Sequence, residues 1–111
     1  MEINRLAFDL VLQKLQPNKV VVLLGARRVG KTELIKKIME KVTEKVLFLN
    51  GDDIESHNLL EIQSTANFKR LLGDTKFLII DEAQEIPAIG KKLKLMVDTI
   101  EDLKVLVTGS S

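Results

Sequence analysis

Apolar residues recur along this chain at two different spacings, and the spacing predicts which segments are helices and which are strands. Between Ile3 and Leu15 they return every three or four residues, which predicts an amphipathic helix that ends before Pro17. Val20 to Leu24 is a continuous β-branched-rich run, typical of a parallel strand that is buried on both faces. From Lys31 the helical spacing returns, with a single apolar face made of Leu34, Ile35, Ile38, Met39 and Val42.

The rest of the chain continues this alternation of strand and helix. Short apolar runs predict three more strands, over 46–49, 77–80 and 103–107. The spacing of apolar residues between Ile54 and Leu72 is mixed, although Ser64 can cap a helix that stops at Gly73. Pro87 can open a further helix. Alternating strands and helices predict right-handed crossovers, so we expect an α/β fold with a parallel sheet between two layers of helices.

Composition and charge narrow the class of protein. The chain has 111 residues, 45% apolar and 30% charged, which suits one soluble globular domain over 1–111, or part of one. A formal net charge of +1 gives no electrostatic reason to expect a nucleic acid or a membrane surface as partner. Cysteine is absent, which excludes disulfides and thiolate sites, and no apolar run is long enough for a membrane span or a signal peptide. We therefore expect a cytoplasmic protein.

The segment between the first strand and the second helix carries the clearest chemical signal. Residues 25–32 read Gly-Ala-Arg-Arg-Val-Gly-Lys-Thr, which matches the Walker A pattern of a phosphate-binding loop. Glycines let the backbone amides and the following helix N-terminus approach phosphate oxygens closely. The sequence predicts that a nucleoside triphosphate is held by Gly25, Ala26, Arg27, Arg28, Val29, Gly30, Lys31, Thr32 and Glu33.

Within that loop, the residue types suggest separate roles. Lys31 is expected to reach the β- and γ-phosphates, and the Thr32 hydroxyl to bind Mg²⁺. Arg27 and Arg28 either add positive charge near the phosphates or are simply solvated on the surface.

The strand over 77–80 runs straight into Asp81-Glu82, which is typical of a Walker B segment. We expect Asp81 to hold Mg²⁺ through a water and Glu82 to act as general base toward the attacking water. Two acids after an apolar strand also occur as an ordinary solvated strand end, and the Walker A segment is what favours the catalytic interpretation.

Three segments together, GARRVGKTEL, FLIIDEAQEIP and VLVTGSS, resemble the ATPase domain of a widespread, mostly uncharacterised prokaryotic AAA-like family. The resemblance implies a P-loop NTPase of the division that has an added strand and a catalytic glutamate, with ATP and Mg²⁺ as cofactors. It implies catalysis at Glu82 with Lys31, and γ-phosphate sensing at Thr108 or Ser110. Gln84 matches the family's usual glutamine after the acidic pair, without an assigned role. GTPases of the Ras type have an Asp-x-x-Gly turn at this point. Here the fourth residue after the strand is Gln84, so the sequence does not match that class.

The same resemblance leads us to expect a chain that is incomplete after the sensor strand and a C-terminal or partner domain beyond it. The P-loop strand, Val20 to Leu24, would then lie at an open sheet edge and promote self-association. Three functions remain open: an ATPase that moves a partner domain, a nucleotide-binding switch with negligible hydrolysis, and a small-molecule kinase. Glu82 favours hydrolysis, and no acceptor pocket or lid for a kinase is recognisable.

Overall fold

The structure is a computed structural model that describes residues 5–25 and 30–110, with side chains from Phe8 onward. Its strands are β1 (Lys19–Leu24), β2 (Val46–Asn50), β3 (Phe77–Asp81) and β4 (Lys104–Gly109). Its helices are α1 (Arg5–Lys14), α2 (Lys31–Lys41), α3 (Ile54–Leu60), α4 (Thr65–Leu72) and α5 (Ile89–Thr99). A short 3-10 turn, η1 (Ala83–Glu85), follows β3.

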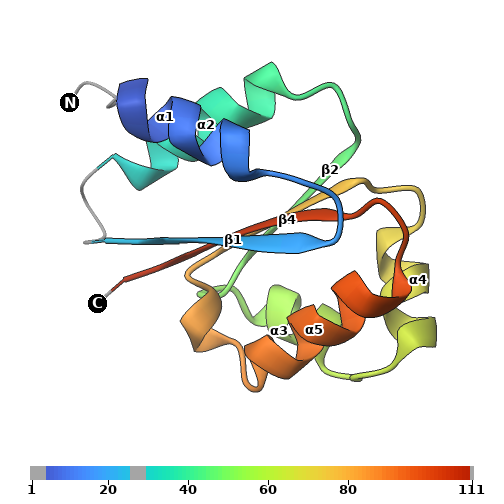
Figure 1. Cartoon of the computed structure of the whole chain (residues 1–111). Helices are drawn as coiled ribbons and strands as arrows, with labels where there is room; N and C mark the ends of the chain where they lie inside the picture. The colour runs from blue at the N-terminus through green and yellow to red at the C-terminus, as the bar shows by residue number, and fades with distance from the viewer. Residues whose placement is uncertain (1–4, 26–29, 111) are drawn as a thin grey trace.

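The strands form one parallel sheet in the order β1-β4-β3-β2. Lys104 at the start of β4 lies opposite Lys19 of β1 on one side and opposite Phe77 of β3 on the other. Helices α1 and α2 cover one face of the sheet, and α3, α4 and α5 cover the other (Figure 1). The parallel sheet between helices that the sequence predicts is therefore confirmed.

The core is divided into two clusters by the sheet, because successive side chains of a strand point to opposite faces. Phe77 and Ile79 of β3 pack with α1 and α2, while Leu78 and Ile80 pack with the helices of the other face. These four side chains are fully buried, so β3 holds its carboxyl-terminal residue, Asp81, on a rigid central strand.

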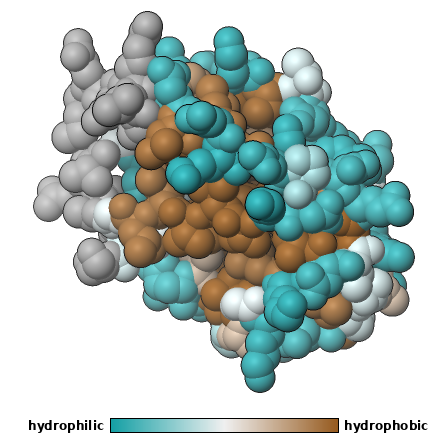
Figure 2. Space-filling model, viewed as in Figure 1, coloured by the Kyte–Doolittle hydropathy of each residue, from teal (hydrophilic) through white to brown (hydrophobic). Residues whose placement is uncertain are grey.

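Strand β1 lies at one edge of the sheet, with β4 as its partner among the described strands. The expectation that it is buried on both faces is wrong: Val22 is 58% exposed and Leu24 is 70% exposed. The apolar run is correctly a strand, but no described helix covers these two side chains. Figure 2, viewed as Figure 1, shows apolar surface gathered across the middle of the face on which β1 lies.

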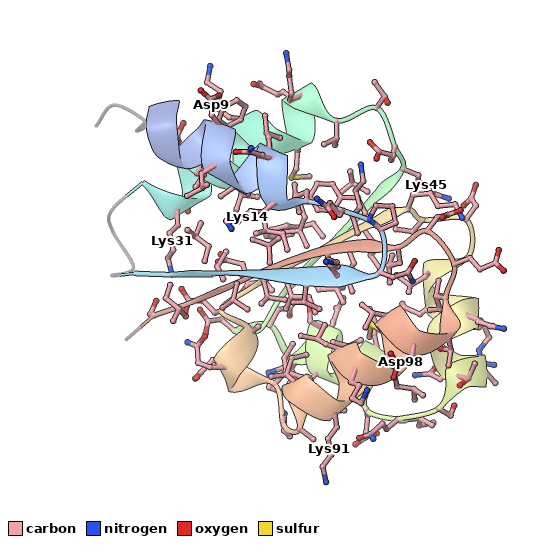
Figure 3. All side chains as sticks on the ribbon, in the orientation of Figure 1. Asp9, Lys14, Lys31, Lys45, Lys91 and Asp98 are labelled. Atoms are coloured by element: carbon pink, nitrogen blue, oxygen red, sulfur yellow. The ribbon has the colours of Figure 1, made fainter. Side chains whose placement is uncertain are left out.

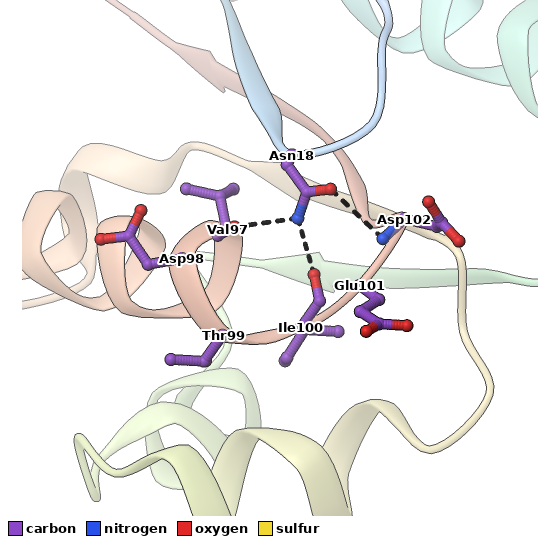
Figure 4. A pocket seen from close by; sticks show the side chains of 7 residues that line it. All are labelled: Asn18, Val97, Asp98, Thr99, Ile100, Glu101 and Asp102. Carbon is purple, nitrogen blue, oxygen red and sulfur yellow. Dashed lines mark hydrogen bonds between the residues drawn. The ribbon is translucent and has the colours of Figure 1, made fainter.

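The Asn18 side chain links the start of β1 to the end of α5 through hydrogen bonds, as Figure 4 shows. Its side-chain nitrogen donates to the carbonyl oxygens of Val97 (2.8 Å) and Ile100 (2.7 Å), which the helix end leaves without partners. Its side-chain oxygen accepts from the Asp102 amide at 3.3 Å. These bonds close a polar hollow of about 430 Å³ at the amino ends of the strands, the end opposite to Gly109.

The helix boundaries confirm some of the sequence signals and correct others. Ser64 caps α4 by accepting from the Asn67 amide. The mixed segment contains α3, a seven-residue helix capped by Asp53, which the apolar pattern did not reveal. Pro87 does not open α5, which begins two residues later because Ala88 has a left-handed backbone (φ 56°). Across the described residues, no helix has the length and apolar character needed to cross a membrane.

Candidate functional site

The carboxyl ends of β1, β4 and β3 meet beside the amino end of α2, which places the three sequence motifs together (Figure 3). Gly25 follows β1 and donates its amide to the carbonyl of Gly109, the last residue of β4, at 3.2 Å. Lys31 is the first residue of α2, and Asp81 is the last of β3. Ala26, Arg27, Arg28 and Val29 lie outside the described residues. Ligands of open α/β sheets bind at this edge.

Gly30 shapes the entry into α2. Its backbone is left-handed (φ 80°, ψ 13°), a conformation that glycine adopts without steric cost. Its carbonyl accepts the Leu34 amide at 2.9 Å, while no side chain caps the helix start. The first amides of α2 are thus available to an anion, which the helix dipole also favours.

Lys31 lies at the centre of the site and is 5% exposed. Its ammonium donates to the Gly109 carbonyl oxygen at 3.0 Å, to Ser110 Oγ at 3.0 Å and to Glu82 Oε2 at 3.3 Å. An ammonium has three protons, so these contacts use its whole donor capacity. A phosphate that binds Lys31 must therefore replace contacts that the protein itself provides.

The Glu82 carboxylate is equally enclosed, at 5% exposure. Gln84 Nε2 donates to Oε1 at 2.8 Å, and Ser110 Oγ lies 2.9 Å from both carboxylate oxygens. The hydrogen bond from Gln84, then those from Ser110 and Lys31, hold the pKa of Glu82 below its usual value, although burial acts in the opposite direction. Glu82 is therefore ionised at neutral pH and has the charge state that a proton acceptor needs.

Asp81 and Thr108 connect the ends of β3 and β4. The Thr108 hydroxyl donates to Asp81 Oδ1 and accepts the Glu82 backbone amide at 3.1 Å. Thr108 is 1% exposed, so its single hydroxyl proton is committed to Asp81. Ser110, in contrast, is half-buried and touches Lys31. Of the two expected sensor residues, Ser110 is the one beside Lys31, and Thr108 orients Asp81.

The two residues expected to bind Mg²⁺, Thr32 and Asp81, carry the oxygen donors that this ion prefers. Both line one hollow of about 350 Å³, whose remaining lining is Ile35, Lys36, Met39 and Phe48. In the part of the chain that the structure describes, no group of three or more His, Cys, Asp or Glu side chains is gathered for a metal. Mg²⁺ in nucleotide sites uses one or two protein oxygens together with phosphates and waters, so one hydroxyl and one carboxylate suffice.

Glu33 does not join this cluster. It is exposed on the first turn of α2, and its carboxylate lies 3.9 Å from the Lys36 ammonium. Of the groups of Glu33, therefore, only the backbone amide in the first turn of the helix can contact an anion bound at the start of α2.

The sequence assigned no role in the site to two residues. Gln84 matched the family's usual glutamine without an assigned role, and here it donates to the carboxylate of Glu82. Gly51 was interpreted as a strand end, yet its amide donates to the Asp81 carbonyl at 2.7 Å, and a Cβ at this position would lie 1.9 Å from the Glu82 carbonyl oxygen. Any side chain at 51 would displace the end of β3. A glycine directly after a strand was the one available signal.

Comparison with solved structures gives the same fold. The chain matches a Pif1 helicase from a study of DNA unwinding at forked DNA with a TM-score of 0.65 and 21% identity, over 99% of this chain and 34% of that one. It matches AMPPCP-bound DnaA from Aquifex aeolicus with a TM-score of 0.57 and 16% identity, over 98% of this chain and 40% of that one. At such identities the likeness establishes the α/β fold of AAA and helicase P-loop domains and nothing finer.

Comparison of sequences identifies the family. An uncharacterised protein of Methanocaldococcus jannaschii is 30% identical over 101 residues, which cover 88% of this chain and 22% of that protein. The chain thus spans about a fifth of the length of this curated relative. The sequence model of AAA_14, described as an AAA domain, matches residues 17–111. This confirms the resemblance inferred from the three motifs, and the chain belongs to the AAA_14 family of AAA domains.

Proposed function

We propose that this chain binds ATP together with Mg²⁺ and hydrolyses it, and that the reaction moves a C-terminal or partner domain. Membership of an AAA family and a P-loop fold favour nucleotide binding. The observation that carries the proposal is the buried pair of Lys31 and Glu82, 3.3 Å apart, at the carboxyl ends of the strands. A phosphate-binding cation and a proton acceptor are there held together in one site.

Phosphate binding follows from the contacts of Lys31. Its ammonium turns from Glu82 to the β- and γ-phosphates, while the open amides at the start of α2 face the same anion. Ser110, now released from the ammonium, lies where a hydroxyl can donate to the γ-phosphate. Thr32 and Asp81 hold Mg²⁺, and Thr108 keeps Asp81 in place. DnaA, a structural relative, was solved with AMPPCP, an analogue of ATP.

Hydrolysis requires an acceptor for the proton of water, and Glu82 is that group. Bound Mg²⁺ supplies charge neutralisation on the phosphates. Glu82 orients a water and takes its proton as the water oxygen bonds to the γ-phosphorus. The bond from that phosphorus to the bridging oxygen then breaks, and ADP and phosphate are released.

A nucleotide-binding switch with negligible hydrolysis is the second candidate. It is favoured by the contacts of Glu82, since both of its carboxylate oxygens accept hydrogen bonds. If Glu82 kept these partners in the complex, it could not take a proton from water, and nucleotide binding alone would hold the conformation.

Calorimetry and single-turnover phosphate release on the full chain separate the two candidates. We expect ATP to bind with Mg²⁺ and to be hydrolysed, and EDTA to abolish the hydrolysis. Binding without any phosphate release would support the switch, and no binding of ATP, with or without Mg²⁺, would rule out both.

Self-association through the edge of β1 is a separate prediction, because this strand exposes Val22 and Leu24 and contains no charged or proline residue after Lys19. We expect light scattering to show a molecular mass that rises with protein concentration. Val22→Lys should restore the monomer by placing a charge on the edge, whereas Ile62→Lys, at an equally exposed apolar position far from β1 in sequence, should not. A wild-type mass that stays monomeric at all concentrations would contradict the prediction.

A further inference from the structure

Gln84 differs from Lys31 and Ser110, the other described partners of the Glu82 carboxylate, in what nucleotide binding would do to its contact. Lys31 leaves Glu82 for phosphate under the proposed function, and Ser110 touches both Lys31 and Glu82. The contact of Gln84 Nε2 with Glu82 Oε1, at 2.8 Å, involves neither Lys31 nor the phosphate-binding groups. It is a contact that can persist while Lys31 changes partner.

The backbone conformation from Glu82 to Ile86 determines where the Gln84 side chain can reach. Glu82 has a left-handed backbone (φ 49°, ψ 48°), and the turn η1 begins directly after it. The Glu85 amide donates to the Glu82 carbonyl at 3.1 Å, and the Ile86 amide to the Ala83 carbonyl at 3.0 Å. Ala83 and Ile86 are buried in the core at 4% and 2% exposure, so the turn is anchored at both ends.

Gly109 completes the arrangement from the side of β4. A Cβ at this position would lie 3.1 Å from Gln84 Oε1 and 3.1 Å from Leu24 Cδ2, so glycine leaves the space that the Gln84 amide uses. The amide oxygen thus faces Gly109, and the amide nitrogen faces the carboxylate. The reverse orientation would place two acceptors against each other, so the hydrogen-bond network assigns the nitrogen to Glu82.

We propose that Gln84 is a positioning residue for hydrolysis, whose amide nitrogen holds the Glu82 carboxylate in place after Lys31 has moved to the phosphate. This inference rests on the proposed ATPase function and adds a residue to it. A carboxylate that exchanges Lys31 for other contacts is held in place by any donor that stays fixed, and a misplaced proton acceptor is a poor one. Gln84 supplies such a donor to Oε1 while Lys31 turns to phosphate.

A kinetic test compares Gln84→Met, which keeps the length of the side chain but cannot donate, with Glu85→Gln on the next, exposed residue. We expect Gln84→Met to lower kcat about 10- to 100-fold, the usual cost of removing a group that orients a catalytic residue, with KM changed less than about twofold. Glu85→Gln should retain the wild-type rate. Unchanged kcat in Gln84→Met, or a loss confined to KM, overturns the inference.

A second readout does not depend on turnover. The side-chain amide signals of Gln84, assigned by their loss in Gln84→Met, are followed by NMR in the full chain. We expect them to be displaced from free-amide positions, to shift in Glu82→Gln, and to stay displaced when Mg²⁺ and a non-hydrolysable ATP analogue bind. Return to free-amide positions in that complex overturns the inference alone. Failure of the analogue to bind, measured by calorimetry, instead overturns the proposed function and the inference with it.

Discussion

Lys31→Ala should weaken ATP binding about 10- to 100-fold, since a hydrogen bond to a charged group contributes about 1.5–3 kcal/mol. Two effects add in this site. The ammonium that meets the β- and γ-phosphates is removed, and Glu82 keeps its negative charge at 5% exposure without the cation beside it. The arriving phosphates would then meet an unneutralised carboxylate. Calorimetry with ATP and Mg²⁺ measures the change in Kd directly.

Lys37→Ala is the matched control for this variant, because Lys37 is an exposed lysine on the same helix and its removal changes the net charge equally. It should bind ATP as the wild type does. Thermal unfolding of both variants is needed as well, because an uncompensated buried carboxylate also destabilises the folded state. Equal affinities of a folded Lys31→Ala protein and the wild type would show that the phosphates bind elsewhere.

Glu82→Gln should suppress hydrolysis about 100- to 10,000-fold, the range that a positioned general base contributes. ATP binding should be retained or strengthened, because glutamine cannot form the ion pair that holds Lys31 at 3.3 Å in this structure. The lysine is then free to turn to phosphate. Single-turnover phosphate release gives the first quantity, and calorimetry with a non-hydrolysable analogue gives the second.

Glu85→Gln serves as the control here too, since it makes the same chemical change on an exposed carboxylate three residues further along. It should leave both quantities unaltered. Hydrolysis by Glu82→Gln at the wild-type rate would show that Glu82 is not the proton acceptor. Another residue would then have to fill that role.

The parts of the site that the sequence predicted are those encoded by neighbouring residues. The Gly25 to Thr32 segment is contiguous, so the identity of Lys31 as first residue of a helix after a glycine turn follows from local spacing. The same holds for Asp81, which directly follows four buried apolar residues. Both positions follow from the chain near them, and the predicted roles add only the general rule that ligands bind parallel sheets at the carboxyl edge.

The contacts between segments could not be predicted in this way. Gln84 binds Glu82 because a left-handed residue and a 3-10 turn bring it back over the carboxylate, and no periodicity encodes that geometry. Thr108 and Ser110 differ in their contacts because the register of β4 against β3 places Thr108, and not Ser110, beside Asp81. For β1, the apolar run predicted a strand correctly but said nothing about what covers Val22 and Leu24, since hydrophobicity does not identify the covering element.

The pairing of β1 with β4 has a consequence for synthesis on the ribosome. Strand β1 begins at Lys19, but its partner runs from Lys104 to Gly109, so β1 must wait for almost the whole described chain before it can join the sheet. Such non-local pairing is also slow, because a long loop has to close first. The Gly109 carbonyl and Ser110 hydroxyl that surround Lys31 arrive at the same late moment. A nascent chain therefore contains β1 and Lys31 long before the β4 residues that complete the site, so an apolar strand stays unpaired until β4 is made, which makes it a natural target for chaperones.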